Sequence, residues 1–155
     1  MNQHAESFDE EVKPRVPPDA DSIAWNDLFL RDEIRRAIKE IKFERPSQVQ
    51  MEAIPFALQG CDLLCQSKSG TGKTMVFVLT ILNSLVVDKE TGMYVTGQAV
   101  IVVNTRELAH QINKEFLKLG KYFRQPALRV GCYFGGISVM DNCEELATLP
   151  PVPTS

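Results

Sequence analysis

The sequence predicts an α/β fold, in which a parallel β-sheet is flanked by helices. Three short apolar segments, residues 62–66, 99–103 and 128–134, alternate with longer stretches whose apolar residues recur at helical spacing. The second segment is β-branched at its last four positions, which is typical of a parallel strand covered on both faces. Because strands and helices alternate along the chain, we expect right-handed crossover connections.

Four stretches are expected to be helical. The first covers residues 27–41, and the second is capped by Ser47 and runs toward Pro55. The third begins near Lys73 and is apolar nearly all round, as in a helix buried against a sheet. The fourth runs from Arg106 to about residue 122. Their predicted core-facing residues are Leu30, Ile34, Ala37, Ile38 and Ile41 in the first helix and Leu108, Ile112, Phe116 and Leu119 in the fourth.

The composition divides the chain into three parts. Residues 1–22 contain six acidic and two basic side chains with almost no apolar periodicity, which predicts a flexible acidic leader. Residues 23–146 have the apolar content of a single folded domain. Residues 147–155 are proline-rich and are not expected to extend the sheet. The net charge of −3 gives no global attraction to nucleic acid, so any such binding depends on local groups.

The four cysteines, Cys61, Cys65, Cys132 and Cys143, lack the paired spacing and the nearby histidines of a zinc site. We therefore expect buried free thiols. The sequence also contains no run of 18 apolar residues and no apolar secretory stretch after Met1, so we expect no membrane association and a reducing compartment.

A phosphate-binding loop is the strongest functional signal. Residues Ser67, Lys68, Ser69, Gly70, Thr71, Gly72, Lys73 and Thr74 follow a predicted strand and open a predicted helix. The glycines let the backbone curl around an anion, and the helix N-terminus attracts negative charge. Lys73 supplies a cation for the β- and γ-phosphates of a nucleotide, and the Thr74 hydroxyl is a ligand for Mg²⁺. The pattern usually begins with glycine where this chain has Ser67, and the alternative is an ordinary surface loop of small residues.

The folded part resembles the first RecA-like lobe of a DEAD-box RNA helicase, whose P-loop typically begins with Ala or Ser. Residues 43–50, Phe-Glu-Arg-Pro-Ser-Gln-Val-Gln, resemble the Q motif of that family. The resemblance implies that Ser47 and Gln50 contact adenine and that Trp25, within a Q-motif region of about residues 23–51, stacks on the base. The amide of Gln50 suits the N6 and N7 edge of adenine, so ATP is favoured over GTP. The alternatives are a helix-surface role for Gln50 and a core-anchor role for Trp25.

The next part of the resemblance concerns RNA. Residues 104–109 are similar to motif Ia, and Gly135 and Gly136 to the glycine pair that follows it, which implies that Thr105, Arg106, Gly135 and Gly136 hold the RNA backbone. An intramolecular ion pair is the alternative for Arg106. Glu107 and His110 are expected to be structural or solvated. Two residues depart from the family pattern, since Lys42 replaces a usual glycine and Asn104 a usual proline. The first strains the turn if that turn needs a positive φ.

No acidic Asp-Glu-Ala-Asp box follows the P-loop in this sequence, and the catalytic set is therefore incomplete. Phosphoryl transfer depends on such groups, so we expect an incomplete lobe that binds ATP and Mg²⁺, binds RNA weakly and has little or no hydrolase activity alone. The resemblance is strongest to the nuclear subgroup acting in pre-mRNA splicing and mRNA export. It implies a nuclear location, with the cytosol as the alternative, and mRNA-processing proteins as partners. The competing functions are a nucleotide-binding or interaction module without turnover and an unrelated P-loop kinase or NTPase.

Overall fold

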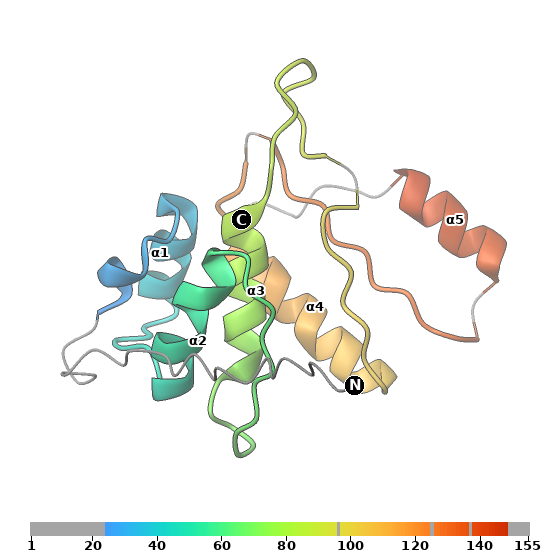
Figure 1. The fold of residues 1–155 in the computed structure, drawn as a ribbon. Coiled ribbons are helices and arrows are strands. Elements are labelled where there is room, and N and C mark those ends of the chain that lie inside the picture. The colour runs from blue at the N-terminus through green and yellow to red at the C-terminus, as the bar shows by residue number, and fades with distance from the viewer. Residues whose placement is uncertain (1–23, 96, 125, 137, 149–155) are drawn as a thin grey trace, which may run out of the picture.

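The computed structural model describes residues 24–95, 97–124, 126–136 and 138–148. A short 3-10 helix, η2 (Trp25–Leu28), precedes five α-helices: α1 (Asp32–Glu40), α2 (Gln48–Leu58), α3 (Lys73–Ser84), α4 (Arg106–Gly120) and α5 (Val139–Thr148). Helices α1 to α4 pack together, whereas α5 lies apart from them at the end of a long extended stretch (Figure 1). The expected leader and proline-rich tail lie outside the described residues, apart from 147 and 148 at the end of α5.

Helix α3 forms the centre of the core. Its residues Val78, Leu79 and Leu82 are fully buried, and α2, α4 and α1 all contact it. Helix α1 buries Ile34, Ala37 and Ile38. Helix α4 adds Ile112, Phe116 and Leu119, so the helical stripes predicted from the periodicity do face the core. Burial of this apolar surface is what holds the helical layer together.

The first two predicted helices differ from the structure at their ends. The stretch predicted as one helix over residues 27–41 is divided into η2 and α1, because Phe29 adopts the left-handed conformation with φ of 51°. Helix α2 does not end at Pro55 and continues to Leu58. Proline removes one backbone donor, and in α2 the helix continues through that loss while it packs along α3. Helices α3 and α4 begin where they were predicted, at Lys73 and Arg106.

The three segments predicted as strands do not form ladders in the part of the chain that the structure describes. Its only β-pairings are two isolated bridges, Val87 with Tyr94 and Arg124 with Ala127. A strand requires a neighbour about 4.8 Å away along its whole length. The described residues bring no such neighbour beside residues 62–66 or 99–103. Leu64, Val100 and Val102 are consequently 99%, 84% and 88% exposed, against the prediction that both faces are covered.

The cysteine prediction was wrong about burial. All four thiols are free, but Cys61, Cys65 and Cys143 are exposed and Cys132 is half-buried. Cys65 lies in the open segment 62–66, so the missing ladder also explains its exposure. The described residues hold no group of three or more side chains suited to a metal ion. Within the same ranges, no helix has the length and apolar character needed to cross a bilayer.

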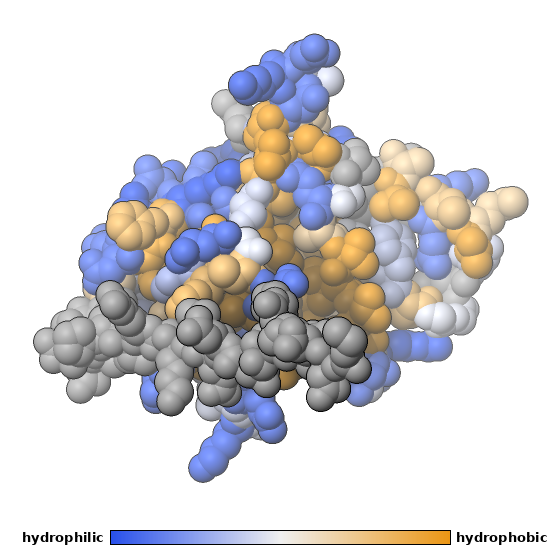
Figure 2. Space-filling view, in the orientation of Figure 1, coloured by the Kyte–Doolittle hydropathy of each residue, from blue (hydrophilic) through white to orange (hydrophobic). Residues whose placement is uncertain are grey.

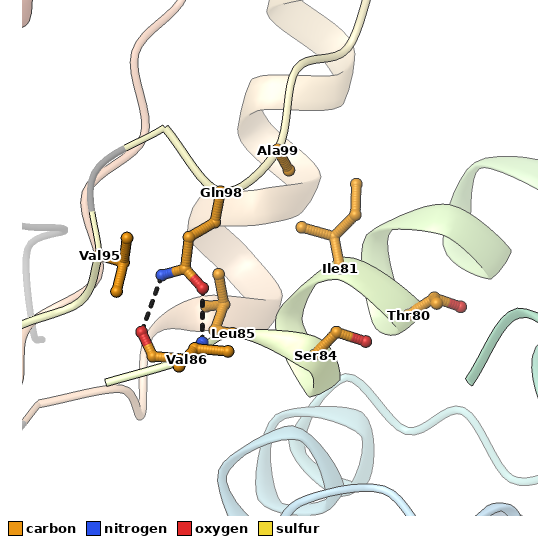
Figure 3. Close-up of a pocket in the computed structure, with 8 residues that line it drawn as sticks. All are labelled: Thr80, Ile81, Ser84, Leu85, Val86, Val95, Gln98 and Ala99. Atoms are coloured by element: carbon orange, nitrogen blue, oxygen red, sulfur yellow. Dashed lines mark hydrogen bonds between the residues drawn. The ribbon is translucent and has the colours of Figure 1, made fainter. Parts of the chain in front are cut away.

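Residues 86–95 form a projecting loop that follows α3. Asp88 shapes it, because its Oδ1 accepts bonds from the backbone of Glu90 and Thr91 and from the Thr91 hydroxyl. At its base the amide of Gln98 donates to the Val86 carbonyl and accepts from the Val86 N–H, in the way a paired strand would (Figure 3). These bonds border a pocket of about 390 Å³ lined by the end of α3 and the loop.

Candidate nucleotide-binding site

The P-loop lies between residues 62–66 and the first turn of α3. Gly70 and Gly72 have φ values of 81° and 91°, a region that glycine enters without strain. Gly72 is required for a second reason, since a Cβ there would lie 2.4 Å from Gln50 Nε2. The N-cap residue of α3 is Gly72, so no side chain accepts a hydrogen bond from the first turn of this helix. The N–H of Met75 bonds to the Gly72 carbonyl, and the N–H groups of Lys73 and Thr74 before it remain available to an anion.

Lys73 is turned back onto the loop. Its Nζ donates to the carbonyls of Ser67 and Lys68, both at 2.6 Å, and to Ser67 Oγ at 3.2 Å. Ser67 Oγ also lies 2.6 Å from Thr71 Oγ1. These three bonds hold the lysine side chain across the loop. Oxygen atoms of a bound phosphate can replace the loop oxygens as acceptors of these bonds. A phosphate oxygen has stronger acceptor character than a carbonyl oxygen.

The residues of the Q-motif segment bond directly to the P-loop. Ser47 Oγ donates to the Thr71 carbonyl at 2.8 Å, and Gln50 Nε2 donates to the Gly72 carbonyl at 3.2 Å. Gln50 Oε1 accepts from the Ser47 N–H at 2.8 Å, which completes a capping box at the start of α2. Gln50 is only 5% exposed, so the helix-surface alternative for it is wrong.

These contacts were not foreseen, although the sequence carries a signal for part of them. The Ser-x-x-Gln spacing of residues 47–50 is the pattern of a capping box. That pattern places the two side chains together at a helix start. The pairing of this helix start with the P-loop, residues 71 and 72, has no local signature, because it joins segments more than 20 residues apart.

Thr74 and Lys73 lie at the edge of a larger cleft of about 510 Å³. Its other walls are apolar and come from α3, from residues 100–103 and from α4. Figure 2 shows apolar surface gathered in this middle part of the molecule. Thr74 is half-buried, and it is not among the described residues for which the structure shows a hydrogen bond from the side chain. That hydroxyl is therefore available as a cation ligand.

Trp25 is 7% exposed and belongs to the core, next to α2. Its burial agrees with the core-anchor alternative, and stacking on a base would require one ring face to open. Its indole Nε1 is buried without a partner among the described residues. A buried donor of this kind costs stability until an acceptor reaches it.

Of the four residues expected to hold RNA, the structure brings at least Arg106 and Gly136 together. A Cβ on Gly136 would lie 3.0 Å from Arg106 Nη2, so this glycine is needed for the close approach. Thr105 caps α4 and accepts the Leu108 N–H at 3.2 Å. Gly135 is exposed, and no atom lies within 4 Å of the position that a Cβ would take there. The ion pairs of Arg35 with Asp32 and of Lys121 with Glu40 do not involve Arg106, and the ion-pair alternative for Arg106 stays a prediction.

Comparison with known proteins decides the family. The sequence profile described as DEAD/DEAH box helicase matches residues 47–153. The chain belongs to this family. It is 39% identical to the human ATP-dependent RNA helicase DDX39A over 90% of its length and 43% identical to the ATP-dependent RNA helicase WM6 of Drosophila melanogaster over 84%. It spans 35% and 29% of these relatives, about a third of their length.

Solved structures confirm the RecA-like fold class. A DEAD box protein from Methanococcus jannaschii is similar with a TM-score of 0.65 and 29% identity, over 79% of this chain and 32% of that one. The RNA-helicase Prp28 from Chaetomium thermophilum, bound to ADP, has a TM-score of 0.63 and 28% identity, over 77% of this chain and 28% of that one. The family assignment leaves no reason to retain an unrelated kinase as an alternative.

Proposed function

We propose that this chain is the ATP-binding lobe of an ATP-dependent RNA helicase, whose whole activity is RNA remodelling driven by ATP. The observation that carries the proposal is the direct bonding of Ser47 and Gln50 to the P-loop at Thr71 and Gly72. A glutamine that served only to cap α2 would not need to bond to the P-loop as well. The family relationship supports the same conclusion.

The residues present suit ATP and Mg²⁺. The phosphates are bound by the P-loop, residues 67–74, through the free N–H groups at the start of α3. Lys73 exchanges its bonds to the Ser67 and Lys68 carbonyls for bonds to phosphate oxygens. Thr74 holds Mg²⁺, which neutralises phosphate charge when it is bound.

Adenine selectivity is assigned to Gln50, with Ser47 and Trp25 beside it. In the structure the Gln50 amide bonds to the Gly72 carbonyl and the Ser47 N–H. Both bonds hold the amide near the P-loop at a fixed orientation. A purine that presents one donor and one acceptor there is favoured, and adenine does so at N6 and N7.

We assign the binding of the RNA backbone to Thr105, Arg106, Gly135 and Gly136. A guanidinium and free backbone N–H groups at a helix N-terminus are the groups that contact phosphate oxygens. This single lobe should bind RNA weakly. By resemblance, the whole protein acts in the nucleus in pre-mRNA splicing or mRNA export, with mRNA-processing proteins as partners.

A second candidate is an ATP-binding module without turnover. Residues 75–155 contain no acidic box, so under either candidate we expect no RNA-stimulated phosphate release from these 155 residues alone. A clear stimulated rate would reject the module.

A titration with a fluorescent ATP analogue tests the leading proposal. We expect Lys73→Ala to weaken binding at least tenfold, because a charge-assisted bond to phosphate contributes about 1.5–3 kcal/mol. The matched control is Lys114→Ala, which removes an exposed lysine from the surface of α4 and should bind as the wild type does. Undiminished binding by Lys73→Ala would reject the P-loop assignment.

A further inference from the structure

Phe134 is the residue before the glycine pair, and two side chains of α4 contact its ring. The Arg106 Cζ lies 5.6 Å from the ring centroid. The His110 ring packs edge-on, with a centroid distance of 5.0 Å and an interplanar angle of 62°. Phe134 is half-buried, so the ring is neither a core residue nor a free surface group.

The surroundings of Arg106 restrict its guanidinium from more than one direction. The Phe134 ring lies within the distance at which a cation is attracted to an aromatic face. Gly136 lies so close that any side chain there would meet Nη2. An exposed arginine without such contacts would sample many rotamers and lose more freedom on binding.

We infer that Phe134 is a positioning residue, which holds the Arg106 guanidinium beside Gly136 so that it meets an RNA phosphate in a fixed orientation. His110 supports the ring from its edge. The inference rests on the proposed role of Arg106 at the RNA backbone. It adds two residues, Phe134 and His110, that the sequence did not assign to this site.

The first test measures RNA affinity of the 155-residue chain by fluorescence anisotropy with a labelled single-stranded oligouridylate. Phe134→Leu keeps an apolar side chain but removes the aromatic face, and should weaken binding about two- to fivefold. Phe134→Tyr keeps the face and should restore wild-type affinity. Thermal unfolding checks that both variants fold, and equal affinity losses in the Leu and Tyr variants would overturn the inference.

A double-mutant cycle separates positioning from an independent contact. Arg106→Ala should weaken binding and lower the salt dependence of log K by about 0.7, the loss of one phosphate contact to a single strand. If Phe134 acts through Arg106, the double variant Phe134→Leu with Arg106→Ala should bind as Arg106→Ala does. Fully additive losses would show that Phe134 acts by another route and would overturn the inference.

An NMR measurement without RNA distinguishes failure of the inference from failure of the proposed function. The Arg106 Nε–Hε signal should be shifted by the Phe134 ring current in the wild type and move toward the random-coil position in Phe134→Leu. A random-coil signal in the wild type overturns the positioning role alone. Unchanged RNA affinity of Arg106→Ala overturns the RNA role of the site, whatever the NMR signal shows.

Discussion

Lys42 and Gly60 occupy equivalent positions after two helices, with different residue types. After α1, Lys42 N–H bonds to the Lys39 carbonyl and Phe43 N–H to the Ile38 carbonyl. After α2, Gly60 and Cys61 make the same pair of bonds. Both central residues are left-handed, with φ of 57° at Lys42 and 80° at Gly60. This is the helix end in which glycine is usual, so the sequence departure at Lys42 does meet a turn that needs positive φ.

We predict that Lys42→Gly stabilises the chain. The left-handed conformation costs a non-glycine residue about 1–2 kcal/mol, and the greater freedom of glycine in the unfolded chain offsets part of this. The expected gain is about 0.5–1 kcal/mol, or a rise of about 1–4 °C in Tm. The measurement is thermal unfolding followed by circular dichroism.

The reciprocal variant is Gly60→Ala. No atom lies within 4 Å of the Cβ it would add, so its effect reports backbone conformation alone. It should lower stability by about 1 kcal/mol. A destabilised Lys42→Gly together with an unaffected Gly60→Ala would show that these helix ends are not strained as described.

Gln50 joins the start of α2 to the P-loop, and Gln50→Glu separates its two bonds. Glutamate retains the acceptor for the Ser47 N–H but loses the donor to the Gly72 carbonyl. It also places a negative charge beside the P-loop. We predict that ATP binding weakens and that the preference of ATP over GTP is lost, as measured by competition titration.

The control for added charge is Gln111→Glu on the exposed face of α4, which should leave both affinities unchanged. If Gln50→Glu kept the wild-type ratio of ATP to GTP affinity, the adenine role of Gln50 would be rejected, even if both affinities fell.

At the scale of elements, α1 and α4 are joined by a cluster of polar and aromatic side chains. The carboxylate of Glu40 accepts from the Lys121 ammonium and from the Tyr122 hydroxyl, the latter at 2.5 Å. Arg36 lies over the Tyr122 ring at 4.5 Å. The hydrogen bond from Lys121 has the largest effect and that from Tyr122 the next largest, and together they hold the pKa of Glu40 below its ordinary value of 4.5.

This cluster predicts a pH dependence of stability. A carboxyl group with a lowered folded pKa stabilises the fold above its unfolded pKa, and the contribution is lost as the pH falls through the folded pKa. Glu40→Gln should therefore lower Tm near neutral pH. The difference from the wild type should shrink as the pH falls below about 4.5. A difference independent of pH would mean that the charge of Glu40 is not what joins the helices.

The helices show what local pattern predicts well. Apolar residues at helical spacing located α1 and α4, the apolar run after the P-loop located α3, and Ser47 as a capping residue located the start of α2. The break at Phe29 and the continuation of α2 past Pro55 were not predicted, because a left-handed phenylalanine and a helix that continues through proline both run against the usual preferences of these residues. Helix α5 was missed, since its apolar residues Val139, Met140 and Leu146 are exposed and form no core-facing stripe.

At the scale of the whole molecule, the α/β fold class followed from alternation alone, and similarity to solved RecA-like lobes confirms it. The strand segments show the limit of that reasoning. β-branched composition at residues 99–103 predicts a strand, but a ladder forms only where a neighbour is paired alongside. The residues of the candidate P-loop could be named from the sequence alone because they are contiguous, and their role in binding stays a prediction. The bonds of Ser47 and Gln50 to that loop required the structure.

The central claim is that Ser67–Thr74 bind the phosphates of ATP. The most direct measurement is the change in backbone amide NMR signals when MgATP is added to the chain. We predict the largest changes at Gly70, Gly72, Lys73 and Thr74, with smaller changes at Ser47 and Gln50. Largest changes elsewhere, or no change at the start of α3 at saturating MgATP, would contradict the account.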